Sequence, residues 1–299
     1  AVAALKRATV LPLRFPHLFK EPRRPPRRIL LYGPPGTGKT LLAAAAAAEY
    51  GAPLVTVSSA DILSKWIGDS ERQLRHIFEA ASAFSRCVLF FDEIDAVASV
   101  RGESGESEAS RRVKTELLLC MQRLCTSNIT FVAATNIPWG LDTAVLRRFD
   151  QLIFVGLPPP EARRSLIVKE VMRVPNELSD GDLEWLVDST DGYSASDICR
   201  ITHYAIMEPI QGISLAEYAR PLATTTAEPA SGIAVNTSIP YAACSRDDEG
   251  AVPIETVPPA AFHVPPVCRG NFEAALREFP PTTSPEEVEK FLKWRKGAK

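Results

Sequence analysis

The sequence predicts an α/β fold in which a five-stranded parallel sheet lies between helices and is followed by a smaller helical domain. Two observations support this prediction. In residues 29–155, short and almost entirely apolar runs alternate with stretches of helical periodicity. This is typical of parallel strands buried on both faces of a doubly wound sheet. In residues 160–207 only helical patterns occur, which indicates a separate helical domain after the sheet.

The first part of the chain contains the elements of the sheet. A helix at Ala3–Val10 precedes a segment rich in proline and arginine that reaches residue 28. The apolar runs that we expect to be strands are Ile29–Tyr32, Leu54–Val57, Val88–Phe91, Thr130–Ala133 and Leu152–Val155. The helical patterns between them are Lys39–Tyr50, Ser70–Ser82 and Glu108–Leu124.

The second part is expected to be helical, with an insertion. Its first helices are predicted at Glu161–Val171, Leu178–Asp188 and Ser194–Glu208. Ser194 and Ser196 are both plausible N-caps of the third helix. Residues 209–269 lack helical periodicity and are rich in proline, threonine and alanine. Apolar fragments at 233–235, 251–254 and 264–267 suggest a small antiparallel insert, with disorder as the alternative for 222–238. Helical patterns return at 270–279 and 285–296.

These patterns divide the chain into segments. We expect a large α/β domain at 1–157, a small helical domain formed by 158–210 and 270–283, an inserted β domain at 211–269, and a C-terminal helix at 284–299.

The composition is that of a globular protein whose charges nearly balance. The 299 residues are 45% hydrophobic and 23% charged, with a formal net charge of −2. A charge so close to zero argues against a protein that coats nucleic acid, so we expect no nucleic-acid partner. The longest apolar run, Leu41–Ala48, is far shorter than the roughly 18–20 residues of a membrane span. No secretory signal is visible either, so we expect a cytoplasmic protein.

A glycine-rich segment follows the first apolar run and opens the next helix. Its residues fit the pattern G-x-x-x-x-G-K-[ST] and are Gly33, Pro34, Pro35, Gly36, Thr37, Gly38, Lys39 and Thr40. The glycines allow backbone N–H groups to converge on phosphate oxygens, and the helix start adds the positive end of its dipole. Lys39 can reach the β- and γ-phosphates, and the Thr40 hydroxyl can bind Mg²⁺. A chance glycine-rich turn would not need this strand–loop–helix context.

Carboxylates end the third apolar run. Val88–Phe91 is followed by Asp92, Glu93 and Asp95, and a buried strand has no packing reason to end in so many acids. This is a Walker B pattern, in which Asp92 would act on Mg²⁺ through water and Glu93 would polarise the attacking water. Asn136 follows the next apolar run and could help to position that water, although asparagine is also common in turns.

Together these residues resemble the motifs of AAA ATPases: Walker A, Walker B, a polar sensor after the next strand, and arginine fingers. The segment Arg147-Arg148-Phe149-Asp150 looks like the AAA finger motif. An arginine supplied by a neighbouring subunit offsets the charge that phosphoryl transfer builds on the γ-phosphate. The resemblance implies an AAA+ P-loop fold, hydrolysis of ATP with Mg²⁺, and a role in trans for Arg147 and Arg148.

Two further segments resemble the pore loops of the meiotic clade of AAA ATPases, which includes katanin, spastin and the vacuolar protein sorting 4 ATPases. The first is Ser64–Arg72 and the second is Gly105–Glu116. An exposed Trp66 is costly on a monomer surface, but six copies lining a channel could grip an extended peptide. A tryptophan packed in the core is the alternative. The residues expected to contact substrate in the pore are Lys65, Trp66, Ile67 and Arg112.

The later part of the chain narrows the resemblance to one family within this clade. Residues 191–194 and 207–210 resemble the small-domain helices of the vacuolar protein sorting-associated protein 4 family, and residues 244–259 resemble its inserted β domain. The chain therefore resembles the ATPase core of this family, without the N-terminal microtubule-interacting-and-trafficking domain.

The resemblance to this family also implies partners and a location. It implies a homo-hexamer when ATP is bound, which threads ESCRT-III subunits through its pore and so disassembles their filaments. It implies a cofactor protein of the ESCRT machinery that binds the β domain. The resemblance also implies that partners recruit the protein from the cytoplasm to endosomal membranes. There it would act in multivesicular body sorting and membrane scission.

Two other functions stay open. The first is a microtubule-severing ATPase of the katanin or spastin type. Acidic microtubule tails favour strongly basic surfaces, and this chain is basic only at Arg23–Arg28 and at its C-terminal Lys-Arg cluster. The second is an inactive AAA-like scaffold. Against it argue the intact Lys39, Asp92, Glu93, Arg147 and Arg148.

Overall fold

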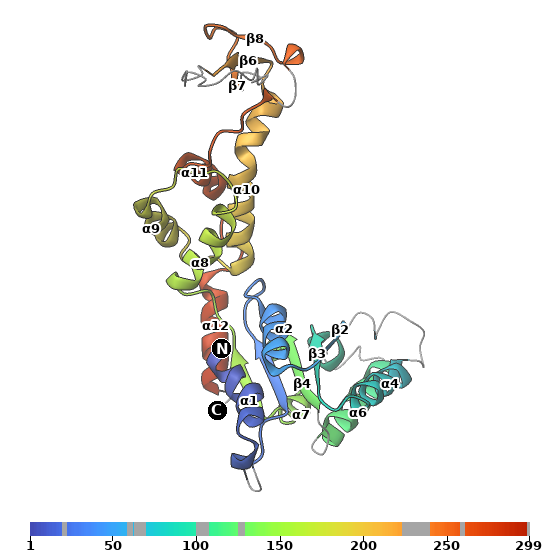
Figure 1. Cartoon of the computed structure of the whole chain (residues 1–299). Helices are drawn as coiled ribbons and strands as arrows, with labels where there is room; N and C mark the ends of the chain where they lie inside the picture. Colours follow the sequence, from blue (N-terminus) through green and yellow to red (C-terminus); the bar gives the residue numbers. More distant parts are fainter. Residues whose placement is uncertain are drawn as a thin grey trace. The chain divides into compact units, whose positions relative to one another are not determined.

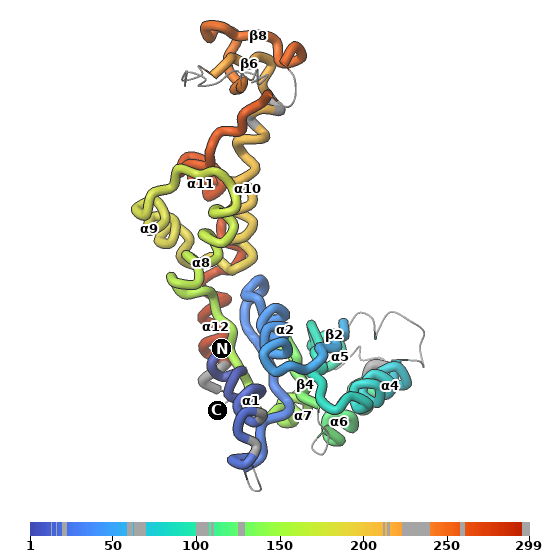
Figure 2. Tube along the Cα trace, in the orientation of Figure 1, coloured from blue at the N-terminus to red at the C-terminus, as the bar shows by residue number. Residues whose placement is uncertain are grey.

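The computed structural model divides into two compact units, which are described separately (Figures 1 and 2). Unit 1 comprises Ala1–Leu157 together with Thr283–Lys299, and unit 2 comprises Pro158–Thr282. The structure describes residues 1–19, 23–58, 62, 70–99, 108–124, 129–222, 240–257 and 261–297. None of the helices in these ranges is long and apolar enough to cross a bilayer.

Unit 1 is built around a five-stranded sheet of order β2-β3-β4-β1-β5, in which all neighbouring strands are parallel. The strands are β1 (Arg28–Tyr32), β2 (Leu54–Ser58), β3 (Cys87–Asp92), β4 (Ile129–Thr135) and β5 (Gln151–Phe154). The predicted parallel sheet is confirmed, and each strand overlaps the apolar run that indicated it. The carboxyl ends of β1, β3 and β4 meet at one edge, which is where open α/β sheets bind ligands.

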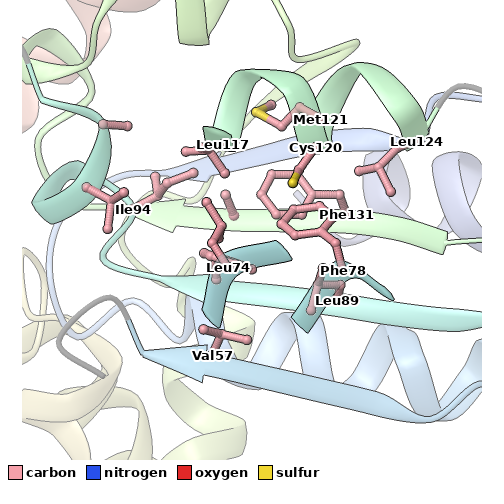
Figure 3. Close-up of a cluster of buried hydrophobic side chains, with 14 of the residues drawn as sticks. Val57, Leu74, Phe78, Leu89, Ile94, Leu117, Cys120, Met121, Leu124 and Phe131 are labelled. Carbon is pink, nitrogen blue, oxygen red and sulfur yellow. The ribbon is translucent and has the colours of Figure 1, made fainter. Parts of the chain in front are cut away.

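Helices cover both faces of this sheet because successive strand residues point to opposite sides. The helices of unit 1 are α1 (Val2–Arg14), α2 (Lys39–Tyr50), α4 (Ser70–Ser82), α5 (Asp95–Ala98), α6 (Glu108–Arg123), α7 (Thr143–Leu146) and α12 (Pro285–Gly297). Leu89 of β3 packs with residues of α4 and α6, whereas its neighbours Val88 and Phe90 pack with α1 and α2. In Figure 3, Leu117 and Met121 of α6 belong to the same apolar layer as Phe131 of β4.

The C-terminal helix α12 belongs to unit 1 although it follows unit 2 in the chain. The Phe291 ring packs against Trp139, with 4.9 Å between ring centroids. The Trp294 ring packs edge-on against Tyr32, with 4.7 Å between centroids. Because Tyr32 is the last residue of β1, α12 contacts the strand that leads into the glycine-rich loop.

Unit 2 contains a helical core and a small antiparallel sheet. Its helices are α8 (Pro160–Val171), α9 (Asp180–Ser189), α10 (Ala195–Leu215) and α11 (Arg269–Glu278). Its three-stranded sheet has the order β7-β6-β8, with β6 (Tyr218–Pro221), β7 (Tyr241–Cys244) and β8 (Val252–Pro253). Ser194 caps α10 as predicted, since its hydroxyl accepts a hydrogen bond from the Asp197 N–H at 3.2 Å.

Two expectations for unit 2 were wrong in detail. Helix α10 does not end at Glu208 but continues through Pro209 to Leu215. Pro209 is buried, so the packing of its ring offsets the backbone hydrogen bond that a proline cannot make. In the insert, β8 lies inside the expected fragment 251–254, fragment 264–267 forms no strand, and fragment 233–235 lies outside the described residues.

Candidate nucleotide-binding site

The glycine-rich segment forms the loop between β1 and α2. Helix α2 begins at Lys39, and its N-cap Gly38 has φ 84° and provides no capping side chain. The first N–H groups of α2 therefore have no side-chain acceptor from the cap, and with the helix dipole they favour an anion. Gly36 also has a positive φ, of 70°, which glycine adopts without steric cost.

Lys39 is held inside this loop. The residue is only 7% exposed, and its Nζ donates hydrogen bonds to the carbonyl oxygens of Gly33 at 2.9 Å and Pro34 at 2.7 Å. Burial lowers the pKa of Lys39 to about 8, although the charges of Asp92 and Asp95 oppose the shift. A phosphate in the loop would add negative charge beside this ammonium and favour its protonated form.

Thr40 and Asp92 join the two motifs across the edge of the sheet. The Thr40 hydroxyl donates to Asp92 Oδ2 at 2.7 Å, although 52 residues separate them in the chain. A hydroxyl and a carboxylate are hard oxygen donors that suit Mg²⁺, which is usually bound by one or two protein oxygens together with substrate phosphates. No group of three or more acidic, His or Cys side chains that could hold a metal occurs in the described part of the chain. A cation here would complete its coordination with phosphate oxygens or water.

Glu93 has an unusual backbone conformation. Among the described residues it is the only non-glycine residue with a positive φ, at 50°. Its N–H donates to Asp92 Oδ1 at 3.1 Å, and the buried Ile94 next to it donates its N–H to the Ala134 carbonyl at 3.0 Å. Neighbouring contacts thus hold the chain in a conformation that costs a non-glycine residue free energy, as is often found at functional sites. The Glu93 side chain is exposed beside Asp92.

The end of β4 adds a polar pair to this edge. The Asn136 Oδ1 atom is buried and has no hydrogen-bond partner among the described atoms. Thr135, in contrast, is fully engaged: its hydroxyl donates to Asp95 Oδ1 at 2.6 Å and accepts from the Ile137 N–H at 2.9 Å. A buried amide oxygen without a partner is uncommon and suits a site that receives a donor from solvent or ligand.

The Thr135–Asp95 contact was missed by the sequence analysis. Asp95 is the third of the acids that begin with Asp92 at the end of β3, and the sequence alone assigns it no role. Its partner lies on β4, which only the strand order places beside β3. The signal was the position of Asp95 itself, since an acid that close to a buried strand end requires a donor.

Arg147 and Arg148 lie apart from this group of residues. Both are exposed and form the turn that follows α7. No hydrogen bond or ion pair connects either guanidinium with the glycine-rich loop, Asp92, Glu93 or Asn136 in the described part of the chain. The two arginines are therefore presented on the surface, as residues that act on another molecule would be.

The predicted pore residues are only partly within the described structure. Lys65, Trp66 and Ile67 lie outside the described residues. Arg112 lies in the first turns of α6, where its exposed guanidinium pairs with Glu108 one turn earlier.

Comparisons with known proteins agree with this geometry. Residues 29–157 match the family described as "ATPase family associated with various cellular activities (AAA)". Residues 241–297 match the Vps4 C terminal oligomerisation domain. The first match covers the sheet and the glycine-rich loop, and the second covers the end of the insert, α11 and α12.

Several curated proteins are similar over most of the chain. Vacuolar protein sorting-associated protein 4 of Dictyostelium discoideum is 42% identical over 226 residues, which cover 75% of this chain and 51% of the relative. Vacuolar protein sorting-associated protein 4A of Rattus norvegicus is 37% identical, covering 98% of this chain and 68% of the relative. Katanin p60 ATPase-containing subunit A1 of Arabidopsis thaliana is 36% identical, covering 97% of this chain and 51% of the relative. The chain thus spans between about half and two thirds of the length of these relatives.

A solved structure is similar as well. The crystal structure of the FIGL-1 AAA domain in complex with ADP superposes with a TM-score of 0.75 at 29% sequence identity, covering 99% of this chain and 86% of that chain.

Proposed function

Since this chain belongs to the vacuolar protein sorting-associated protein 4 family of AAA ATPases, we propose that it is an ATP-driven remodelling enzyme that disassembles ESCRT-III filaments. The observation that carries the ATPase activity is the contact between Thr40 and Asp92, which joins the glycine-rich loop to the acids after β3. The remodelling activity rests on the family relation, and the sequence-based prediction of this family is confirmed.

The residues of the site have distinct roles in this proposal. Lys39 and the N–H groups at the start of α2 bind the phosphates of ATP, and Thr40 and Asp92 hold Mg²⁺ against them. Mg²⁺ neutralises charge that develops on the phosphate oxygens. Glu93, which is exposed beside Asp92, polarises the attacking water, and the free Oδ1 of Asn136 accepts a hydrogen bond from it.

The exposed arginines complete the site of a neighbouring subunit. In the described part of the chain, the guanidinium groups of Arg147 and Arg148 form no hydrogen bond or ion pair with the glycine-rich loop, which supports action in trans. An arginine finger contributes about 10³–10⁵ in rate in well-studied cases. The chain contains an oligomerisation domain, and we propose that it assembles into a hexamer when ATP is bound. Mainly monomeric protein in nucleotide-free buffer and hexamers with ATP, measured by light scattering, would support this.

A mutation of the water-polarising residue tests the catalytic part. Glu93→Gln should bind Mg²⁺–ATP but hydrolyse it far more slowly, because the amide cannot accept the proton of the attacking water. Glu278→Gln, at an exposed position of α11, is the matched control and should behave as wild type. Unchanged turnover in Glu93→Gln would remove Glu93 from this role.

A comparison of two substrates tests the remodelling part. The full-length protein, including any segment needed to bind substrate, should disassemble ESCRT-III filaments when ATP is present. It should leave microtubules intact. Severed microtubules and intact filaments would instead favour the katanin-type function. The proposal also includes Mg²⁺ as cofactor, a β-domain-binding cofactor protein, and recruitment to endosomal membranes through partners.

A further inference from the structure

The exposed arginine turn stands on a very short helix. Helix α7 contains only the residues Thr143–Leu146, and Arg147 and Arg148 follow it directly. So short a helix is not stable by itself, because helix nucleation is unfavourable and few hydrogen bonds compensate for it. Contacts with the rest of unit 1 must therefore determine where the two guanidinium groups point.

The C-terminal side of the turn is anchored by two contacts. Phe149 is buried, and its ring stacks on Phe131 with centroids 6.0 Å apart. Asp150 accepts hydrogen bonds from the backbone N–H groups of Arg27 and Arg28, each at 3.0 Å, and forms an ion pair with the Arg28 side chain. These contacts fix the chain where it enters β5.

The N-terminal side of the turn is anchored by Asp142. Its side chain accepts a hydrogen bond from the Ala144 N–H at 2.8 Å and so caps α7. Its own N–H donates to the Ala98 carbonyl at 2.9 Å. The second carboxylate oxygen, Oδ2, lies 3.1 Å from Nζ of Lys114 on α6. One carboxylate thus joins α6 to α7, the helix that presents the arginines; both helices are labelled in Figure 1.

The ion pair is shielded from water, unlike most ion pairs among the described residues. The Lys114 side chain is 13% exposed and that of Asp142 is 25% exposed. Burial by itself would raise the pKa of Asp142, but the hydrogen bonds from Ala144 and Lys114 outweigh it, so the net pKa lies below the ordinary value. Removing one partner of a shielded pair leaves the other charge poorly solvated, so its neighbours must rearrange.

We propose that Lys114 and Asp142 are positioning residues for the arginine fingers: their ion pair holds the finger turn so that hydrolysis in the neighbouring subunit can occur. This rests on the proposed function, because fingers act only within a ring. Lys114 lies two residues after Arg112, which we predict to contact substrate, so the same helix carries both contacts. The pair acts through Arg147 and Arg148 and does not itself contact the nucleotide.

Two variants break the pair with little change in shape. Lys114→Met removes the charge and keeps a long side chain, and Asp142→Asn keeps an oxygen that can cap α7. Lys6→Met is the matched control, since Lys6 also joins two helices of unit 1 through Glu49, at 2.9 Å, but both side chains are about half exposed. Exposed pairs contribute little, so Lys6→Met should retain wild-type activity.

The expected result is a loss of kcat without a loss of nucleotide binding. A displacement of about 1 Å can cost about 10²-fold in rate, so Lys114→Met and Asp142→Asn rings should show a kcat lowered by roughly 10- to 100-fold. The affinity of the monomer for Mg²⁺–ATP should not change. Lys114→Arg, which keeps the charge, should recover much of the activity and serves as the readout if Lys114→Met does not fold.

Two further measurements separate a positioning role from a merely structural one. Adding Lys114→Met to an Arg147→Ala, Arg148→Ala variant should lower kcat no further, because the pair acts only through the fingers. Mixing Lys114→Met subunits with Glu93→Gln subunits should restore some hydrolysis, since a Lys114→Met site then faces intact fingers.

Several outcomes would overturn the inference. The first is a wild-type kcat in assembled Lys114→Met and Asp142→Asn rings. The second is weaker binding of ATP to the monomer of either variant. The third is a further loss of kcat when Lys114→Met is added to the Arg147→Ala, Arg148→Ala variant. These outcomes leave the proposed function standing. Absence of hydrolysis in wild-type rings would overturn the proposed function instead.

Discussion

Gly33 lies where the chain leaves β1, and the absence of a side chain there lets β5 pass close by. Its φ is +154°, and a Cβ at this position would lie 2.0 Å from the carbonyl oxygen of Val155 and 2.9 Å from its carbonyl carbon. The Val155 N–H also donates to the Tyr32 carbonyl at 2.8 Å. Because the clashing atoms are backbone, no side-chain rotation can relieve them, and Gly33→Ala must push β1 and β5 apart.

The cost of this substitution follows from two contributions. Overpacking of a well-packed region costs about 1–3 kcal/mol, and a backbone conformation that L-residues avoid adds roughly 1–2 kcal/mol. The sum is about 2–5 kcal/mol, and 1 kcal/mol corresponds to about 2–4 °C in Tm for a domain of about 150–250 residues. We therefore expect the melting temperature of unit 1 to fall by about 4–20 °C.

A second glycine separates the two contributions. Gly51 ends α2 with a φ of +62°, but nothing lies within 4 Å of a Cβ placed there. Gly51→Ala therefore carries only the conformational cost of roughly 1–2 kcal/mol. Thermal unfolding of both nucleotide-free variants, followed by circular dichroism, makes the comparison. Equal melting temperatures for Gly33→Ala and Gly51→Ala would refute the steric argument.

The remaining predictions concern the site and the pore. Glycine tolerates the positive φ of 50° at Glu93 and alanine does not, so Glu93→Gly should be about 1 kcal/mol more stable than Glu93→Ala in thermal unfolding; equal stabilities would show that the conformation is not strained. The pKa of Lys39 is lowered to about 8 in the free protein, and bound phosphate raises it, so the affinity for ATP should be full below pH 8 and fall as the pH rises above it. Calorimetry at pH 8.5 in two buffers that differ in ionisation enthalpy should detect proton uptake on ATP binding, and Lys39→Arg should abolish this uptake. Absence of proton uptake in the wild type would contradict the lowered pKa of Lys39. Trp66→Ala should keep its melting temperature and basal ATPase activity but lose filament disassembly, because the sequence predicts an exposed loop there and such a residue adds little stability. A core tryptophan would instead cost about 3–5 kcal/mol, so a large drop in melting temperature would identify Trp66 as a packing residue.

Much of the nucleotide site could be predicted because its chemistry is local in sequence. Lys39 and Thr40 follow a strand and open a helix, so their neighbours along the chain already place them at a phosphate site. Lys39–Tyr50 and Ser70–Ser82 were predicted with the bounds that the structure shows. Contacts between distant segments could not be predicted in this way. The pairing of β6 with β7 joins residues on either side of 223–239, and β6, which contains Arg220 and Pro221, has no apolar pattern that marks it.

By itself, the sequence determined the family and the parallel sheet, and it predicted which residues we propose to face the nucleotide. It could do so because strands buried on both faces must be apolar throughout, and because a phosphate loop needs its glycines and lysine at fixed spacing. Only the tertiary structure decided which strands are neighbours, and hence that Asp92 meets Thr40 and that Lys114 meets Asp142. The positive φ of Glu93 was decided there too, since the energy of a conformation or an ion pair depends on surroundings that distant parts of the chain provide.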